Sequence, residues 1–440
     1  MEILGLIGIA ISIIVLIYLA VKGVNVVIAA PIAAIIIIIS NRMDFFPSLI
    51  GTENSYLTGV TSYIVSLFAV FFLGAIFAKL IDTSGAALSI SQKVLHYIGT
   101  DSPYAVLIAI YLITAFLTYG GVSLFIVVFV LTPLAKPLFK KLNIAWNIAP
   151  LPMVLGFGTF TMTMLPGTPA AQNVIPTQYL GTTLTAAPVL GIIGSIVAII
   201  TSLWYMKYVL KKSMKKGENF STYSSGEDIV ERDIEQIPSF ARSVSPLLLL
   251  IFSILVGSFF KVNNILLIGL VIAIILSIVL FRNYIKNLKG NLNTAATSSV
   301  NTIFVTAAVV GFGAVVTNAP GFESIKSALL SIPGNPLISL AVAASLFGLI
   351  TGSASGTIPI VLKAFANDYL AMGIAPEVIH RVTSMSSAWL TNMPHSGVVL
   401  TIFSVTGLNH KNGLKYITLG FIVSNLSALI VVLIAAMLLY

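Results

Sequence analysis

Residues 104–135 read YAVLIAIYLITAFLTYGGVSLFIVVFVLTPLA, a stretch of 32 residues without a charged side chain. As a single helix it would be about 48 Å long, at about 1.5 Å per residue, whereas the hydrocarbon core of a bilayer is about 30 Å thick. Gly120 and Gly121 stand at its middle, and glycine weakens helices. The stretch therefore predicts a re-entrant hairpin of two half-helices, with its tip covered by protein or water. Residues 337–368, with Gly352 near the middle, predict a second hairpin.

The rest of the chain has the composition of a membrane protein. Of 440 residues, 58% are hydrophobic and 8% are charged, against roughly 25% charged in soluble domains. Ten further apolar stretches approach or exceed the length that crosses a bilayer: 3–21, 24–41, 61–81, 149–175, 183–206, 245–260, 263–282, 297–318, 381–405 and 414–439. The first has no basic residues before it and no cleavage site, so we expect a retained membrane helix and no signal peptide. The sequence predicts an all-α polytopic protein in a lipid bilayer.

The basic residues orient these crossings. Because each hairpin returns to the side that it left, both termini are expected outside the cytoplasm. Eighteen of the 23 Lys and Arg residues then lie on the cytoplasmic side, and five lie on the other: Arg42, Lys261, Lys326, Lys363 and Arg381. This bias agrees with the positive-inside rule. The net charge of +9 is therefore read as a topology signal of a cytoplasmic-membrane protein, and no nucleic-acid partner is expected. The absence of cysteine excludes disulfides and thiolate metal sites.

A hydrophilic segment divides the chain into two similar parts. It covers residues 207–243 and is expected to be a cytoplasmic connector, the alternative being a regulatory or lipid-binding element. The flanking halves, 1–206 and 244–440, each contain five crossings and one hairpin, so the second enters the membrane the other way up. Gly74-Ala75 followed by residues 82–85 (DTSG) recurs, at similar spacing, as Gly313-Ala314 followed by residues 318–321 (NAPG). Inverted repeats of this kind are typical of secondary transporters with a substrate site at the midplane.

Each half also contains a crossing that cannot be one continuous helix. Residues 165–173 read LPGTPAAQN, and residues 391–397 read TNMPHSG. Proline and glycine interrupt helices, so backbone amides and carbonyls become free at membrane depth. The alternative is an ordinary proline kink in which Thr168 and Asn173 cap the broken ends.

The two tips and the two breaks predict an anion site. If they converge, helix N-termini, free amides and hydroxyl groups bind a carboxylate without needing an arginine. Gly and Ser clusters also occur where helices pack closely, and only the repeated constellation favours a site. The candidate substrate-binding residues are Gly120, Gly121, Ser123, Thr168, Gln172, Asn173, Ser353, Ser355, Thr357, Asn392, His395 and Ser396.

His395 is the one ionisable side chain expected near mid-membrane. Such groups are usually functional, and His395 is the candidate proton carrier or a hydrogen-bond donor to substrate. The alternative is a structural histidine that bonds a free carbonyl. His96, His380 and His410 are expected in loops and receive no role.

Four motifs resemble the GntP family of gluconate and hydroxybutyrate permeases: LGAIFAKL (73–80), LTYGGVSLF (117–125), TFTMTMLPGTP (159–169) and PHSGVVLT (394–401). The resemblance spans about 60–425 and is closest to the hydroxybutyrate-permease-like branch. It implies membership of the ion transporter superfamily, with proton-coupled symport, a homodimer and an elevator movement. That branch usually has Asp and Asn flanking Pro-His, where this chain has Thr391 and Ser396. The departure leaves the coupling ion and the substrate open.

These observations predict a secondary transporter of a small hydroxy-monocarboxylate, such as 3-hydroxybutyrate or gluconate. Proton coupling is expected, sodium coupling is the alternative, and no other cofactor is expected. An intramembrane hydrolase with Ser355 as nucleophile and His395 as base is a different class, but the first half repeats the architecture without any such histidine. A channel is disfavoured by re-entrant tips in inverted halves.

Overall fold

The computed structural model describes residues 2–99, 101–122, 124–223, 237–260, 262–394 and 396–440. Two predicted substrate contacts, Ser123 and His395, lie outside these residues. The described residues form helices and no strand, which confirms the all-α prediction. The first half contains α1 (Glu2–Val21), α2 (Val26–Ser40), α3 (Phe45–Ile50), α4 (Tyr56–Thr83), α5 (Ala86–Ile98), α6 (Pro103–Tyr119), α7 (Leu124–Lys141), η1 (Trp146–Ile148), α8 (Pro150–Gly158), α9 (Phe160–Thr163), α10 (Ala171–Leu180) and α11 (Pro188–Lys215).

After the short α12 (Phe220–Tyr223), the second half begins. Its helices are α13 (Phe240–Phe259), α14 (Ile265–Phe281), α15 (Leu288–Asn318), α16 (Phe322–Leu330), α17 (Pro336–Thr351), α18 (Ala354–Ala371), α19 (Pro376–Ser386), α20 (Gly397–Thr406) and α21 (His410–Leu439). Among the described residues, five helices are long and apolar enough to cross a membrane alone: α4, α11, α13, α15 and α21. Shorter apolar helices include α1, α2, α6, α14 and α17.

Local sequence explains where several helices begin. Ser55 and Thr58 form a reciprocal capping box at the start of α4, and Asn409 and Asn412 do the same for α21. Each box satisfies amides that a helix start leaves free. Proline occupies the first turn of α6, α8, α11, α17 and α19, where its missing N–H costs nothing.

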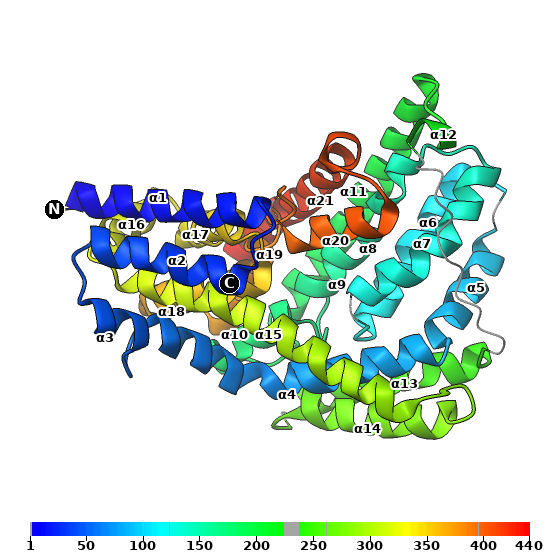
Figure 1. The fold of residues 1–440 in the computed structure, drawn as a ribbon, viewed down its shortest axis with the longest axis horizontal. Helices are drawn as coiled ribbons and strands as arrows, with labels where there is room; N and C mark the ends of the chain where they lie inside the picture. Colours follow the sequence, from blue (N-terminus) through cyan, green and yellow to red (C-terminus); the bar gives the residue numbers. More distant parts are fainter. Residues whose placement is uncertain (1, 100, 123, 224–236, 261, 395) are drawn as a thin grey trace.

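The long helices α4 and α15 pack along each other and run across one edge of the molecule (Figure 1). At one end lie α1, α2, α16 and α17, and at the opposite end lie α5, α6 and α7 (Figure 1). Helices α11 and α21 also pack against each other. The two hairpins therefore occupy opposite ends of the molecule, with the α4–α15 pair spanning the distance between them.

The order of helices and their contacts repeat in the two halves. A pair of helices, a long helix, a short helix, a hairpin, an interrupted segment and a final long helix follow one another in each. The contacts between the halves are reciprocal: α2 packs on α15 and α14 on α4, α16 on α1 and α5 on α13, and α10 on α18 and α20 on α7.

Candidate functional site

The first hairpin bends at Gly120 and Gly121, between α6 and α7. Gly121 has a φ of +89°, a left-handed conformation that residues with a Cβ rarely adopt. A Cβ on Gly120 would lie 2.5 Å from the Cδ2 atom of Leu247 in α13. Glycine at 121 therefore permits the turn, and glycine at 120 lets the tip pack directly against the Leu247 side chain of α13.

The first interrupted segment contacts this tip. Helix stops at Thr163 and resumes at Ala171. The Tyr119 hydroxyl donates to the Pro166 carbonyl at 2.9 Å, and the Thr118 and Thr161 hydroxyl oxygens are 3.4 Å apart. We call residues 164–170 the first break. These bonds join the first tip to the first break.

Asn173 closes the first break from within. Its Nδ2 donates to the carbonyls of Thr168 at 3.0 Å and Leu184 at 2.8 Å. Its Oδ1 lies 3.1 Å from Nε2 of His380, in α19 of the other half. Both amide hydrogens of this fully buried side chain are thus used within the protein.

His380 and Arg381 correct the sequence interpretation. His380 was expected in a loop and Arg381 at the non-cytoplasmic start of the crossing 381–405, but both lie inside α19 and are fully buried. His380 Nδ1 is 2.7 Å from the Thr182 hydroxyl, while the Arg381 guanidinium donates to the carbonyls of Thr163 and Ala186, each at 2.8 Å. Thr163 ends α9 directly before the first break, and Ala186 lies between α10 and α11, so α19 ties the start of the break to the connection that follows α10. We call His380 and Arg381 the α19 staple.

The other two histidines were also expected in loops, and this was wrong. His96 lies exposed in α5. His410 begins α21, with Nε2 2.9 Å from the Pro394 carbonyl.

The second hairpin tip gathers hydroxyl groups. Gly352 has a φ of +61°, and Ser353 caps α18 by accepting from the amide of Gly356 at 3.3 Å. The hydroxyl oxygens of Thr351 and Thr357 are 2.7 Å apart, and those of Ser353 and Ser355 are 3.2 Å apart. Of the three predicted residues here, Thr357 is fully buried, while Ser353 and Ser355 are partly exposed.

The second interrupted segment contacts this second tip. Residues 387–396, which we call the second break, separate α19 from α20. Ser396 Oγ donates to the Gly352 carbonyl at 3.3 Å. Asn392 is 4% exposed, and its Nδ2 is buried without a hydrogen-bond partner among the described residues. Its amide could therefore donate to a polar ligand.

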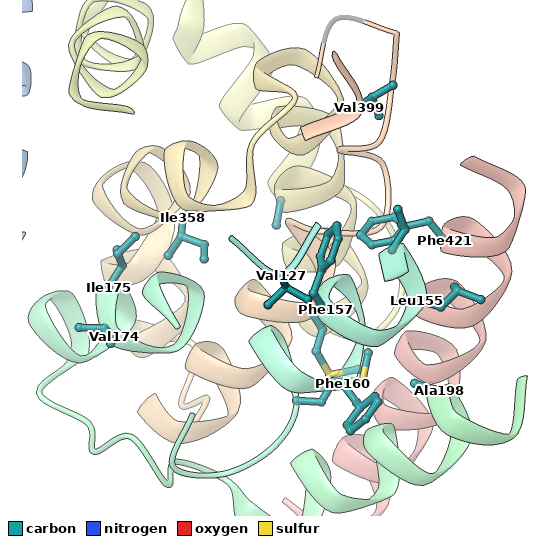
Figure 2. Close-up of a cluster of buried hydrophobic side chains, with 14 of the residues drawn as sticks. Val127, Leu155, Phe157, Phe160, Val174, Ile175, Ala198, Ile358, Val399 and Phe421 are labelled. Atoms are coloured by element: carbon teal, nitrogen blue, oxygen red, sulfur yellow. The ribbon is translucent and has the colours of Figure 1, made fainter. Parts of the chain in front are cut away.

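The hairpin helices and the helices that follow the breaks share one apolar core. Figure 2 shows side chains from both hairpins, both interrupted segments and both final helices in a single cluster. Val127 and Ile358 come from the hairpins, Val174 and Val399 from the segments after the breaks, and Phe421 from α21. Gln172 stands at the start of α10, partly exposed, and its carbonyl accepts from Ser384 at 2.9 Å. The structure thus packs helices from both hairpins and the helices after both breaks around one apolar cluster.

Comparisons with known proteins agree with this architecture. The profile of the GntP family permeases matches residues 4–438. The uncharacterized transporter YxjC of Bacillus subtilis (strain 168) is 33% identical over 443 residues, covering 91% of this chain and 92% of YxjC. The crystal structure of the YdaH transporter of Alcanivorax borkumensis, described as having an unusual topology, is similar with a TM-score of 0.56 and 15% identity. That match covers 86% of this chain and 87% of YdaH, and it concerns the fold alone.

The family match extends over nearly the whole chain, including both hairpins and both breaks. Permeases of this family are transporters, which sets aside the hydrolase alternative built on Ser355 and His395. This chain is a multi-pass membrane transporter and belongs to the GntP permease family.

Proposed function

We propose that the protein is a secondary active transporter that couples proton entry to symport of a small hydroxy-monocarboxylate, such as 3-hydroxybutyrate or gluconate. The observation that carries the proposal is the second tip, where hydroxyl groups gather next to the second break and its unpartnered Asn392 amide. Hydroxyl and amide donors suit both the carboxylate and the hydroxyl of such a substrate. Sodium is the alternative coupling ion.

We propose that the two halves form an inverted repeat and move by an elevator mechanism. The repeated helix order and the reciprocal contacts support the repeat. The α19 staple supports a single moving body, because it fastens the first break to the second half through three hydrogen bonds of Asn173 and Arg381. Following the family resemblance, we propose a homodimer.

We propose a cytoplasmic-membrane location with both termini outside the cytoplasm. Four lysines lie over tyrosine rings, at 4.8 to 5.7 Å from the ring centres: Lys22 on Tyr18, Lys93 on Tyr97, Lys207 on Tyr104 and Lys212 on Tyr208. All four lysines are among the eighteen assigned to the cytoplasmic side. Lysine and tyrosine are typical of membrane interfaces, so these pairs support a common cytoplasmic interface.

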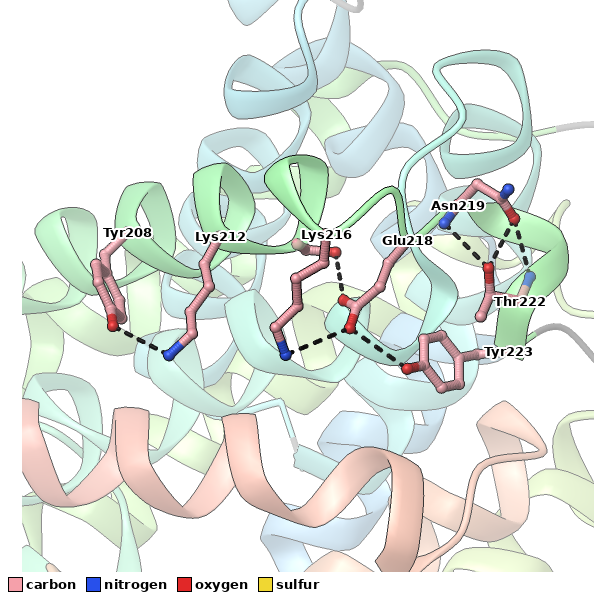
Figure 3. Close-up of polar contacts among 8 residues, drawn as sticks. Tyr208, Lys212, Lys216, Glu218, Asn219, Thr222 and Tyr223 are labelled. Atoms are coloured by element: carbon pink, nitrogen blue, oxygen red, sulfur yellow. Dashed lines mark hydrogen bonds and ion pairs between the residues drawn. The ribbon is translucent and has the colours of Figure 1, made fainter.

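The start of the predicted connector is ordered by polar contacts at this interface. Figure 3 shows Lys212 donating to the Tyr208 hydroxyl at 3.2 Å and Lys216 paired with Glu218 at 3.9 Å. Helix α11 continues to Lys215, so its last turns extend into the segment first assigned to the connector. These contacts support the connector interpretation of this part of 207–243.

The test is uptake of labelled 3-hydroxybutyrate and gluconate into proteoliposomes, with proton and sodium gradients imposed separately. We expect accumulation of one of these acids under an inward proton gradient. His395→Ala should abolish that accumulation while leaving substrate exchange across the membrane, whereas His96→Ala, at an exposed position of α5, should change neither. Unchanged proton-driven uptake in His395→Ala would remove His395 from coupling, and no uptake of either acid would reject the substrate assignment.

A further inference from the structure

The first half of α15 carries a polar face on a membrane helix. Thr294, Ser298, Asn301 and Thr302 are all exposed, and their spacing places them on one side of the helix. We call these four residues the α15 polar face. Val300 and Phe304, which are 41% and 44% exposed, lie on the neighbouring strip of the same helix. The exposed surface of α15 is therefore divided into a polar strip and an apolar strip.

The amide of Asn301 distinguishes this strip from a lipid-facing one. Thr294 and Thr302 donate to carbonyls four residues earlier, at 2.9 and 2.8 Å, and such hydroxyls are tolerated in lipid. Asn301 makes no side-chain hydrogen bond in the part of the chain that the structure describes. Asn301 lies about 20 Å along α15 from Leu288, near the middle of this 31-residue helix. It is therefore away from the headgroup region at the helix end. An exposed amide at this depth requires water or a polar partner.

A buried hydroxyl stands at the inner end of this face. Tyr63 of α4 is 2% exposed, and its hydroxyl forms no hydrogen bond among the described residues. Its polar neighbours are Thr306, one turn beyond Thr302, and Ser355 of the second tip. This tip packs on α15, where a Cβ on Gly356 would lie 3.2 Å from Cγ1 of Val309. The polar face thus leads along α15 to an unpartnered hydroxyl next to the proposed substrate site.

The first half has an equivalent face. Aligning Gly74-Ala75 with Gly313-Ala314 puts Ser62 in register with Asn301 and Val65 in register with Phe304. Ser62 and Ser66 are exposed, while Val65, which is 84% exposed, marks the apolar strip. In an inverted repeat the two faces would start from opposite sides of the membrane.

We propose that the α15 polar face lines the aqueous route between the cytoplasm and the second tip, and that the Tyr63 hydroxyl contacts the substrate carboxylate where this route meets Ser355. The inference rests on the proposed transport of a carboxylate. Arg282, Lys286 and Lys289 stand just before the face, at the cytoplasmic mouth of the route, where positive charge attracts an anion.

Because the chain contains no cysteine, single cysteines report water access without background. Ser298→Cys, Asn301→Cys and Thr302→Cys are compared with Val300→Cys and Phe304→Cys at the same depth, in full-length protein in proteoliposomes. We expect a charged thiol reagent, added to the cytoplasmic side, to modify the polar-face cysteines at least tenfold faster than the two controls. Equal rates at all five positions would overturn the route. Disulfide-linked dimers at Asn301→Cys would also overturn it, because the face would then be covered by a second copy.

The modification rates are measured without substrate, so they test the aqueous route independently of the transport proposal.

The Tyr63 contact is tested by uptake kinetics of Tyr63→Phe against Tyr111→Phe, since Tyr111 of α6 is another buried tyrosine with an unpartnered hydroxyl. We expect Tyr63→Phe to raise the KM about tenfold with unchanged thermal stability, and Tyr111→Phe to leave the KM unchanged. The same KM in both variants would overturn the Tyr63 contact.

Discussion

The two breaks occupy equivalent positions in the two halves, but they use their polar groups differently. Around the first break, Asn173 makes three hydrogen bonds, and Arg381 satisfies the carbonyls of Thr163 and Ala186. Between Pro376 and Thr406, four described residues have a buried side-chain atom without a partner: Arg381, Thr383, Ser386 and Asn392. No such atom is found in the described residues from Pro150 to Ala187.

This difference teaches that similar interruptions serve different purposes. A buried polar atom without a partner costs stability, so a protein usually retains it for a ligand or a functional need. The first break is therefore read as a structural joint. In the second half, Asn392 of the second break and Thr383 and Ser386 of the preceding helix α19 are the groups whose hydrogen bonding a polar substrate would complete. Substitutions at the two breaks separate these two roles.

The largest effect is expected at Arg381. Arg381→Met leaves the Thr163 and Ala186 carbonyls buried without donors, and bonds to a charged donor contribute about 1.5–3 kcal/mol each. We expect a loss of about 3 kcal/mol of stability, seen as a large fall in the thermal unfolding midpoint of the purified transporter. The unfolding midpoint of Arg381→Lys should fall between those of the wild type and Arg381→Met, because one ammonium group does not reproduce the two-pronged geometry of a guanidinium.

The matched control is Arg282→Met, at the exposed end of α14. It should unfold like the wild type. An Arg381→Met protein as stable as this control would show that the first break is not held by the α19 staple.

Asn173→Ala tests whether the first break has a structural role. The variant removes three hydrogen bonds and leaves the Thr168 carbonyl without a donor, while the Leu184 carbonyl keeps the Gly167 amide; we expect this to cost about 2 kcal/mol. Substrate affinity, measured as the KM for uptake by the folded fraction, should change little, because neither amide hydrogen is free. A raised KM with normal stability would return Asn173 to the substrate site.

Much of the fold was predictable because membrane helices must be apolar along most of their length. The predicted hairpin 104–135 corresponds to α6 and α7, and the predicted crossing 263–282 corresponds to α14. The observed helix boundaries lie outside the predicted ones where a helix extends past its most apolar stretch. α15 begins at Leu288 rather than near 297, since polar residues continue a helix as long as its backbone bonds are made.

The α19 staple was not predicted, for a physical reason. His380 pairs with a side chain 207 positions away in the chain, and Arg381 pairs with backbone carbonyls, which leave no mark in the sequence. Counting charges at the ends of apolar stretches assigned His380 to a loop and Arg381 to the outer end of a crossing. The available signal was two adjacent ionisable residues at the very start of a crossing, where a membrane helix rarely tolerates them without a function.

Asn392→Ala tests the second break. Removing an amide that has no partner in the protein should leave the unfolding midpoint unchanged or slightly raised. If the amide donates to the substrate, the KM should rise about tenfold, equivalent to about 1.4 kcal/mol. Asn425→Ala in α21 is the control, because Asn425 is also buried with one unpartnered atom, and its KM should stay at the wild-type value. Equal KM values in both variants would remove Asn392 from the site.

The smallest effect, and the most direct contrast between the halves, is expected for two buried threonines. Thr161 Oγ1 donates to the Gly156 and Phe157 carbonyls at 3.0 and 2.8 Å, whereas Thr383 Oγ1 has no partner among the described residues. Valine has nearly the same shape, so only the hydroxyl changes. Thr161→Val should destabilise the protein by about 1 kcal/mol, and Thr383→Val should stabilise it by a similar amount, because it removes a buried unsatisfied group.

Thermal unfolding of the two variants in the same detergent, with and without saturating substrate, separates the two explanations of the free Thr383 hydroxyl. If Thr383 belongs to the substrate site, the wild type should gain more stability from substrate than Thr383→Val does, since bound ligand stabilises the folded state in proportion to its affinity. If substrate stabilises both proteins equally, the hydroxyl is a cost of packing in α19, and the substrate contacts of the second half narrow to the second tip and Asn392.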